Sequence, residues 1–391
     1  MKKIYKFRLY PSKKQVDTLN NVLDDCRCLY NAQLEYEQFV YFSEKRFANR
    51  IELNNLLPDL KIINPSLKQI HSQMLQNVND RAIKAFNGFF SRVQKGQKVG
   101  YPRFKGKNRY NSFTYPQSGF EFTSQSKLKL SKIGEISIKL HRTIKGKIKT
   151  LTIMLTPTNK WFACFSVQQD ITPVKRSPNN IVGLDLGLEK FAMLSDGSVI
   201  ENPRWLKKSL ELLKLRSRQL SEKEKGSKNR EKTRLKLAKL HEKVANQRLD
   251  FLHKLTYQLV NEYDCIVLED LKPSEMRNKY LQFSINDASW KKFRQLLTYK
   301  AEEAGCKLNF INPRDTSKRC SRCGNLQEMP LSKRVYECFF CGNSIHRDLN
   351  SALNILHYNL FHKHRVGHTR INACGDVPLG TSLKQETTNF S

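Results

Sequence analysis

The chain has 391 residues, of which 39% are hydrophobic, and its 69 Lys and Arg outnumber its 36 Asp and Glu by 33. This length predicts two or three domains, and the hydrophobic content excludes wholesale disorder because it is sufficient to fill their cores. A net charge of +33 has to be neutralised, and the usual partner is the polyphosphate backbone of a nucleic acid. We expect no membrane partner, since no stretch approaches the roughly 18 apolar residues of a spanning helix and no signal peptide opens the chain.

The first predicted elements are one strand and two helical stretches. Alternating apolar residues predict a strand over residues 4–9, and Pro11 ends it. Ser12 is a suitable N-cap for a helix over about 13–47, where apolar residues recur at helical intervals. The same pattern predicts a second helix over about 65–90.

A basic segment without a single acid follows, over residues 91–110. Its glycines and Pro102 predict a loop, and its aromatic residues are interleaved with basic ones. The segment is therefore a candidate nucleic-acid contact, and a merely well-hydrated loop is the alternative. Its basic residues are Arg92, Lys95, Lys98, Arg103, Lys105, Lys107 and Arg109.

Short alternating runs between residues 113 and 169 predict strands of a mostly antiparallel sheet or small barrel. The clearest runs are 136–140, 151–155 and 161–167. Together with the first strand they indicate one strand-rich domain into which a helical module, about residues 12–98, is inserted. Residues 171–180 have the composition of a linker.

The second half of the chain alternates strands with helices, which predicts a mixed α/β sheet. The predicted elements are strands at 181–187 and 190–200, helices at 202–222 and 228–262, a strand at 265–268, a helix at 287–304 and a strand at 308–311. The two long helices are rich in Lys and Glu, and a solvated face with local ion pairs explains this better than a coiled coil or a nucleic-acid-binding arm. The tail from about Asn372 is polar and non-periodic, so we expect it to be disordered.

Four of the ten cysteines form two Cys-x-x-Cys pairs, each followed by glycine and separated by fourteen residues. Four thiolates can surround one tetrahedral zinc ion, and a glycine permits the tight turn that aims both sulfurs of a pair at the metal. We predict a structural site, because four protein ligands leave no open position for catalysis. A redox dithiol and two local disulfides are the alternatives, and a reducing cytoplasm explains the dispersed remaining cysteines better than a disulfide framework. The predicted zinc ligands are Cys320, Cys323, Cys338 and Cys341.

Three acids stand at the ends of apolar elements. Asp185 and Glu269 each end an apolar run, and Asp348 precedes an apolar helix. Such positions would bring three carboxylates to one rim of the sheet, where hard oxygen ligands can hold two Mg²⁺ ions roughly 4 Å apart for phosphodiester hydrolysis. As structural alternatives, Asp185 is a turn residue and Asp348 a helix N-cap. Asp270 competes with Glu269 as the functional acid.

The order of these motifs is characteristic. They are Gly183-Leu-Asp185-Leu-Gly187, Val267-Leu-Glu269-Asp-Leu271, Thr316-Ser-Lys-Arg-Cys320-Ser-Arg-Cys323-Gly324, Cys338-Phe-Phe-Cys341-Gly342, His346-Arg-Asp348-Leu-Asn350 and the basic Val99-Gly-Tyr-Pro-Arg-Phe-Lys105. In this order they resemble the TnpB family, the OrfB-type proteins of insertion sequences that are the presumed ancestors of type V CRISPR effectors. The resemblance covers essentially residues 1–371.

The resemblance implies a multidomain fold with α+β and α/β parts. The implied parts are a wedge-type β-barrel (residues 1–11 and 99–172), an inserted helical recognition module (12–98), a ribonuclease H-like RuvC nuclease domain (178–316 and 346–371), an inserted zinc ribbon (317–345) and a disordered tail (372–391).

The resemblance further implies an RNA-guided endonuclease of double-stranded DNA. In that activity a guide RNA transcribed from the transposon end pairs with the target, and the protein reads backbone shape and a short adjacent motif. Asp185, Glu269 and Asp348 match the family's catalytic acids, and the four cysteines match its zinc ligands. We therefore expect one structural zinc ion, two catalytic magnesium ions and a location at the nucleoid in the cytoplasm.

Three other activities share parts of this pattern. An ATPase of the actin and sugar-kinase type would share the sheet, but its glycine-rich adenosine motifs are not evident and a charge of +33 would be unusual for it. A transposase that performs strand transfer with the same three acids stays open, although the ribbon between the second and third acids favours TnpB. A nuclease-inactive RNA-guided repressor would be expected to lack a catalytic acid, and all three are present.

Overall fold

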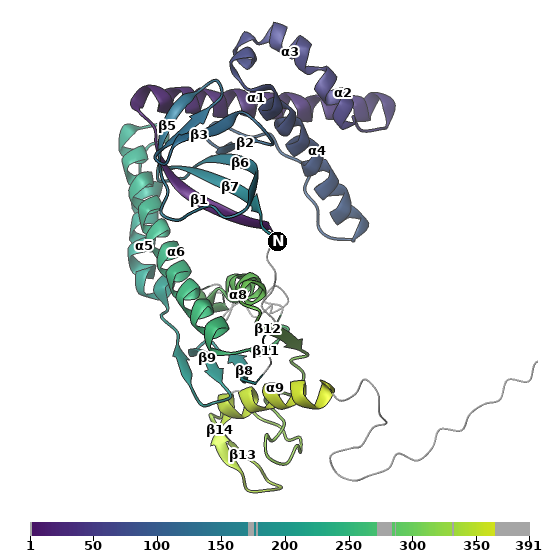
Figure 1. Ribbon diagram of the computed structural model, residues 1–391, viewed down its shortest axis with the longest axis vertical. Coiled ribbons are helices and arrows are strands. Elements are labelled where there is room, and N and C mark those ends of the chain that lie inside the picture. Colours follow the sequence, from purple (N-terminus) through teal and green to yellow (C-terminus); the bar gives the residue numbers. More distant parts are fainter. Residues whose placement is uncertain are drawn as a thin grey trace, which may run out of the picture. The chain divides into compact units, whose positions relative to one another are not determined.

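The computed structural model divides the chain into two compact units, Met1–Ile171 and Thr172–Ser391 (Figure 1). It describes residues 2–170, 176, 179–271, 284–285, 287–330 and 332–363. Most of the predicted linker and the whole predicted tail from Asn372 lie outside the described residues. Among the described helices, none is long and apolar enough to cross a membrane.

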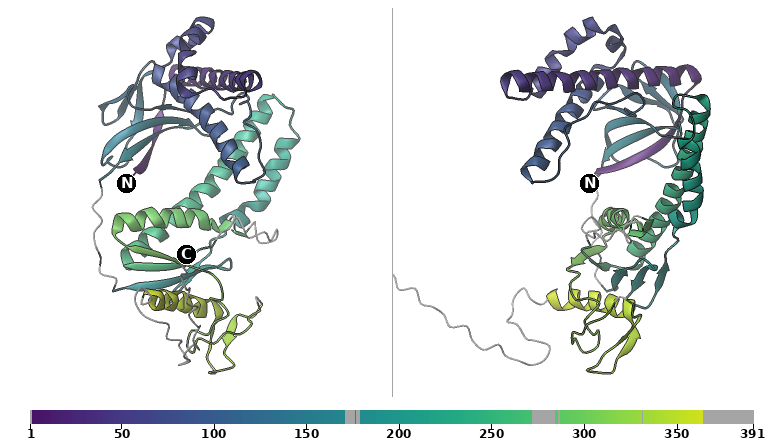
Figure 2. Two further views of the ribbon diagram at one scale, coloured as in Figure 1. Left: turned by 90° about the vertical axis from the view of Figure 1, so that its right-hand side faces the viewer. Right: turned by 180° about the vertical axis from the view of Figure 1, so that it is seen from behind.

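The N-terminal unit is built on a seven-stranded, strongly curled antiparallel sheet (Figures 1 and 2). In spatial order its strands are β2 (Ser112–Tyr115), β6 (Lys147–Leu155), β7 (Trp161–Gln168), β1 (Lys2–Tyr10), β5 (Gly134–Lys139), β4 (Lys127–Leu130) and β3 (Phe120–Ser124). The alternation that predicted these strands places Phe7, Phe113 and Phe165 in the core, where all three are fully buried. Because β1 lies between β7 and β5, residues 11–111 form an insertion into the sheet.

The insertion is helical. Its elements are α1 (Lys13–Glu44), α2 (Arg50–Asn55), α3 (Leu57–Ile63), the 3₁₀ turn η1 (Pro65–Gln69) and α4 (Ser72–Gln94). Ser12 caps α1 as predicted, since its hydroxyl accepts a hydrogen bond from the Gln15 N–H at 3.3 Å and the Gln15 side chain accepts one from the Ser12 N–H at 2.9 Å.

The predicted helix over 65–90 is wrong at both ends. Ile70 has an extended backbone that separates η1 from α4, and the apolar periodicity could not distinguish the two elements. At the other end α4 continues to Gln94, so the first four residues of the predicted basic loop, Arg92 among them, are helical. The short helices α2 and α3 were not predicted.

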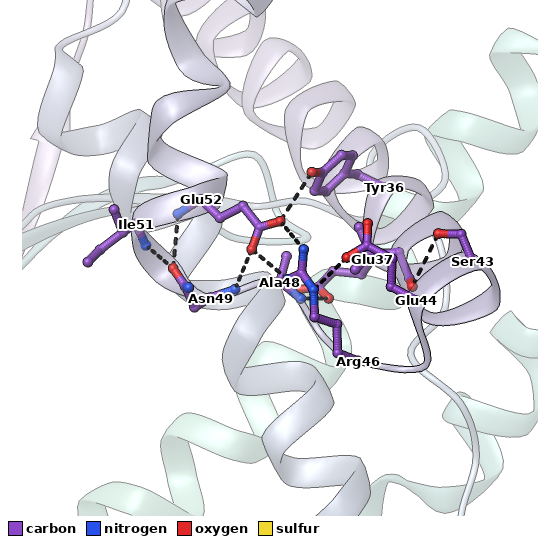
Figure 3. A network of polar contacts seen from close by, with 10 residues as sticks. Tyr36, Glu37, Ser43, Glu44, Arg46, Ala48, Asn49, Ile51 and Glu52 are labelled. Carbon is purple, nitrogen blue, oxygen red and sulfur yellow. Dashed lines mark hydrogen bonds and ion pairs between the residues drawn. The ribbon is translucent and has the colours of Figure 1, made fainter.

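A polar network holds the turn between α1 and α2 (Figure 3). The buried Glu37 carboxylate accepts a hydrogen bond from the Ala48 N–H at 3.0 Å, and burial raises the pKa of this carboxyl group. Arg46 forms an ion pair with Glu52 at 2.8 Å, and Asn49 caps α2 through the N–H groups of residues 51 and 52. Side-chain oxygens thus accept hydrogen bonds from backbone N–H groups that the turn and the first turn of α2 leave without a backbone partner.

The C-terminal unit contains the predicted mixed sheet, with five strands. In spatial order they are β10 (Val199–Glu201), β9 (Lys190–Leu194), β8 (Ile181–Leu186), β11 (Cys265–Glu269) and β12 (Lys307–Ile311). Strands β8, β11 and β12 are parallel, whereas β9 and β10 run antiparallel to their neighbours.

Helices cover both faces of this sheet, and Figure 2 shows α8 (Trp290–Ala304) and α9 (Arg347–Lys363) on opposite sides of it. Val182, Leu184, Ile266 and Leu268 pack with apolar residues of α6 (Lys228–Glu262) and α8 on one face. On the other face, Cys265 and Val267 pack with Ile355 of α9. A strand buried on both faces is an apolar run, which is why the sequences of β8 and β11 show no alternation.

The long helices α5 (Trp205–Ser221) and α6 pack against each other. In α5 only Leu213 is buried, and the buried residues of α6 begin at Val244. Their exposed sides carry local ion pairs such as Lys214 with Glu211 and Arg234 with Glu231. This arrangement agrees with the predicted solvated, ion-paired faces.

Candidate functional site

Asp185 and Glu269 lie on neighbouring parallel strands at the same level. Leu184 of β8 stands opposite Leu268 of β11, so the next residue of each strand is one of the two acids. Side chains alternate along a strand, and both leucines belong to the core under α6 and α8. Both carboxylates therefore face the other side of the sheet, which α9 covers.

Asp348 reaches the same place from the first turn of α9. The helix approaches β8 unusually closely: a Cβ atom added to Gly183 would lie 2.3 Å from the Ala352 carbonyl oxygen. Asp185 lies two residues beyond Gly183 along the strand, and Asp348 lies one helical turn before Ala352. Glycine at this position therefore permits the contact that brings the third acid to the first two.

The three carboxylates interact electrostatically. Burial raises the pKa of Asp185 well above its usual value, and the negative charges of Glu269 and Asp348 raise it further. Burial also raises the pKa of Glu269, against a hydrogen bond from the Thr316 hydroxyl that lowers it. This cluster has an excess of negative charge, which is the condition that bound cations relieve.

The structure excludes two structural alternatives for these acids. Asp185 is a residue of strand β8 and not of a turn. Asp348 lies inside α9, where its N–H donates to Nδ1 of His346 at 3.2 Å, so it is not the N-cap.

Asp270 has a different environment from Glu269. Its carboxylate accepts a hydrogen bond from Arg294 of α8, and the Arg294 guanidinium also lies 4.0 Å from the centre of the Phe310 ring. Asp270 thus points to the α8 side of the sheet, away from the acid cluster. The geometry favours Glu269 over Asp270 as the second member of the site.

The four predicted cysteines form one cluster, with all four sulfur atoms within 4.8 Å of one another. The Sγ atoms of Cys320 and Cys341 are 3.7 Å apart, and those of Cys323 and Cys338 are 3.6 Å apart. Four sulfurs at about 2.3 Å from a zinc ion form a tetrahedron with edges of about 3.8 Å, so the residues fit this metal.

The two Cys-x-x-Cys turns have the same local geometry. Gly324 and Gly342 have φ angles of 78° and 66°, and each donates its N–H to the carbonyl of the first cysteine of its pair at 3.0 Å. Residues other than glycine rarely adopt such left-handed conformations, which explains the glycine that follows each cysteine pair in the sequence. A short hairpin of β13 (Val335–Glu337) and β14 (Ser344–His346) and the buried Tyr336 complete this small unit.

Three polar residues around the acids were not predicted from the sequence. Thr316 donates a hydrogen bond to Glu269, and the buried Asn350 and Asn354 of α9 bond to the chain between Thr316 and Ser321. Two asparagines four residues apart in the middle of an apolar helix are the sequence signal for this arrangement, because such amides are costly to bury without partners.

All seven basic residues proposed as nucleic-acid contacts are exposed, and in the described part of the chain none forms an ion pair with an acid. The segment itself is anchored: the Asn31 side chain accepts from the Lys105 N–H at 2.8 Å and donates to its carbonyl at 3.0 Å. Tyr101 packs edge-on against Phe86 and Phe89. The segment therefore presents exposed basic side chains, and its backbone is anchored at Lys105.

A carboxylate cluster, a separate four-thiolate site and an exposed basic loop in one highly basic chain are typical of metal-dependent proteins that act on nucleic acids. The profile of the OrfB family of IS605-type elements, described as a probable transposase, matches residues 163–279. Two further profiles match, a Cas12f1-like TNB domain at residues 290–355 and a helix-turn-helix domain at 1–46. Here the described part of 1–46 forms a strand and one long helix, not two helices joined by a turn.

Relatives of nearly full length establish the family. The chain is 31% identical to a putative RNA-guided DNA endonuclease of Streptomyces pristinaespiralis, over 96% of this chain and 92% of the relative. It is also 31% identical to the putative RNA-guided DNA endonuclease InsQ of Escherichia coli K12, over 99% and 97% of the two chains. The chain belongs to the TnpB (OrfB) family.

More distant likenesses agree with this assignment. The chain is 30% identical to the CRISPR-associated endodeoxyribonuclease Cas12f1 of Sulfoacidibacillus thermotolerans, over half of each protein. The structure of a Cas12f1 complex with guide RNA and target DNA matches with a TM-score of 0.58 at 14% identity, over 88% of this chain and 83% of that one. The multidomain α+β fold is thus similar to that of a Cas12 effector.

Proposed function

We propose that this chain is the RNA-guided DNA endonuclease of an insertion sequence and that it hydrolyses phosphodiester bonds of double-stranded DNA. The observation that carries the proposal is the convergence of Asp185, Glu269 and Asp348 at one rim of the five-stranded sheet. Two relatives of nearly full length are named putative RNA-guided DNA endonucleases.

The proposed domains follow from this assignment. In the N-terminal unit, the curled sheet is the wedge-type barrel (residues 1–11 and 99–172) and the inserted helices are the recognition module (12–98). In the C-terminal unit, the mixed sheet is the ribonuclease H-like RuvC domain (178–316 and 346–371) and the four-thiolate unit is the zinc ribbon (317–345). Residues 372–391 are assigned to a tail. The observations that support this division are the insertion between β1 and β2 and the position of the four-thiolate unit between β12 and α9.

The carboxylates and thiolates are proposed to hold different metals. Asp185, Glu269 and Asp348 offer hard oxygen ligands to two Mg²⁺ ions, whose chemistry is to activate water and stabilise the leaving oxygen. The cysteines offer soft ligands to one Zn²⁺, which stabilises a unit whose core is too small to fold on its own apolar contacts.

The proposed partners are a guide RNA from the transposon end and its double-stranded DNA target. Pairing between guide and target would supply sequence specificity, and the basic protein would bind the phosphate backbones. The exposed loop with Arg103, Lys105 and Lys107 is one such contact.

The test compares binding and cleavage in the same variants. The protein is co-purified with its RNA, and Asp185→Ala, Glu269→Ala and Asp348→Ala are assayed on a matched DNA target in magnesium. We expect all three to bind the target as well as the unsubstituted protein or slightly better, because negative charge beside the DNA is removed, and not to cut it. Asp270→Asn is the control and should cut.

Other outcomes distinguish the alternatives. Cleavage by Asp185→Ala would end the nuclease assignment as proposed, and an inactive Asp270→Asn beside an active Glu269→Ala would move the second acid by one residue. Joined DNA products in place of free ends would indicate a strand-transferring transposase. Guided binding without any cleavage by the unsubstituted protein would indicate a repressor.

A further inference from the structure

We infer that Thr316 is a positioning residue for Glu269 and that the segment 316–321 couples the four-thiolate site to the acid cluster. The inference rests on the proposed function, because it assigns a task to residues around the proposed metal-binding acids. Its physical basis is a chain of hydrogen bonds between buried groups.

The first link is the Thr316 hydroxyl. It lies 2.5 Å from Oε1 of Glu269 and 3.2 Å from the Pro313 carbonyl oxygen. A hydroxyl has one proton, and the shorter contact, to a carboxylate, is the stronger one. Thr316 is buried, with 8% of its surface exposed, so solvent has little access to this bond. The bond fixes one oxygen of Glu269 and leaves the other free to meet a cation.

The second link ties the backbone of this segment to α9. Asn354 donates to the carbonyl oxygens of Thr316 and Arg319, at 2.8 Å and 2.6 Å. Asn350 donates to the Arg319 carbonyl at 2.7 Å and accepts from the Ser321 N–H at 2.9 Å. Both asparagines are buried, and a helix places residues four apart on the same side. The helix that carries Asp348 therefore also holds the segment that orients Glu269.

The third link is the metal-binding pair itself. Ser321 lies between Cys320 and Cys323, so the last bonded residue of the segment belongs to the first Cys-x-x-Cys turn. Six residues, 316–321, thus connect the carboxylate of Glu269 to the thiolate site. Asn350 and Asn354 of α9 form hydrogen bonds with the first, the fourth and the last of them. Partners that orient metal ligands in this way are commonly worth roughly 10- to 100-fold in metal affinity or activity when they are removed.

The decisive variant is Thr316→Val, which removes the hydroxyl and keeps the branched shape. We expect cleavage of the matched target to fall roughly 10- to 100-fold and the Mg²⁺ concentration for half-maximal cleavage to rise. Thr316→Ser retains the donor and should restore most of both properties. Thr298→Val, an exposed threonine of α8 in the same unit, is the control for the substitution itself and should behave like the unsubstituted protein.

A second readout does not depend on cleavage. Binding of Mn²⁺ to the protein without nucleic acid is measured by electron paramagnetic resonance, and zinc content by elemental analysis. Thr316→Val should bind Mn²⁺ more weakly at unchanged zinc content. Asn354→Leu should weaken Mn²⁺ binding in the same way, and the double variant should be weakened by less than the sum of the two effects, since both act through one segment.

The outcomes separate this inference from the proposed function. Unchanged Mn²⁺ affinity and cleavage in Thr316→Val, beside an inactive Asp185→Ala, would overturn the positioning role alone. Equal defects in Thr316→Ser and Thr316→Val would also overturn it, because the hydroxyl would then be irrelevant. If the unsubstituted protein cuts nothing, the proposed function fails and the Mn²⁺ measurement still decides the role of Thr316.

Discussion

Replacing Gly183 with alanine perturbs the contact that positions the third acid. The added Cβ would lie 2.3 Å from the Ala352 carbonyl oxygen and 2.7 Å from the Leu356 nitrogen, both of them backbone atoms of α9. To bring the shorter contact from 2.3 Å to 3.0 Å, the helix has to retreat by about 0.7 Å. Asp348 moves with it, because it lies one turn away on the same helix.

A shift of this size is small for stability and large for catalysis. Overpacking of a core typically costs about 1–3 kcal/mol, which a domain of this size survives. A misplacement of about 1 Å in a catalytic constellation can cost about 100-fold in rate. We therefore expect Gly183→Ala to remain folded and to bind guide RNA, and to cleave the matched target roughly 10- to 100-fold more slowly.

The assay pairs thermal unfolding and RNA retention with single-turnover cleavage. Gly88→Ala is the matched control, because Gly88 lies within α4 and its added Cβ would meet only the end of the Arg92 side chain, at 3.9 Å. It should leave cleavage unchanged. If Gly183→Ala cleaved at the rate of the unsubstituted protein, the close approach of α9 to β8 would not be what places Asp348.

Three further predictions concern charge and metals. Reversing the charges of Arg103, Lys105 and Lys107 should weaken nucleic-acid binding. It should also reduce the slope of log affinity against log salt concentration by about 0.7–0.9 for each phosphate that the protein no longer neutralises. An unchanged slope would contradict the proposed role of the loop. Because the pKa of Asp185 is raised, protons compete with Mg²⁺ as the pH falls, so the Mg²⁺ concentration for half-maximal cleavage should decrease with rising pH, and a pH-independent value would refute this. Cys320→Ser should lower zinc content and impair cleavage indirectly, since the thiolate site is bonded to α9, whereas full activity without stoichiometric zinc would exclude a structural zinc.

Most strands and long helices could be predicted from the sequence because each has a strong local pattern. The N-cap at Ser12 and the apolar runs of β8 and β11 needed no tertiary information. The boundary between η1 and α4 could not be predicted, because apolar residues at intervals of three or four fit a 3₁₀ turn and an α-helix alike. The last turn of α4 was missed because residues 91–110 were assigned to one loop from their shared basic composition. The glycines that break a helix begin only at Gly96, so nothing in Ser91–Gln94 ends α4 earlier.

The acids of the site could be predicted from the sequence for a different reason. An acid at the end of a fully apolar strand is conspicuous, since burial excludes charge elsewhere in such a run. The apolar pattern alone leaves Glu269 and Asp270 as competitors, because adjacent residues face opposite sides of a sheet and the pattern does not show which side α9 covers. The resemblance to the TnpB family is what selected Glu269. Thr316 was missed because its partner is set by the path of the chain between β12 and the first cysteine pair, which no local pattern encodes.

The physical problem at this site is buried negative charge. Burial, and after it the charges of Glu269 and Asp348, destabilise the ionised form of Asp185 and raise its pKa. The fold offsets this destabilisation with contacts between uncharged groups. They are the backbone packing of α9 on Gly183 and the hydrogen bonds that the side-chain amides of Asn350 and Asn354 donate. These contacts tie α9, which carries Asp348, to β8 and to the segment that holds Thr316 beside Glu269. The positions of the three acids are therefore set by backbone packing and by hydrogen bonds outside the carboxylate cluster, and not by attraction among the acids themselves.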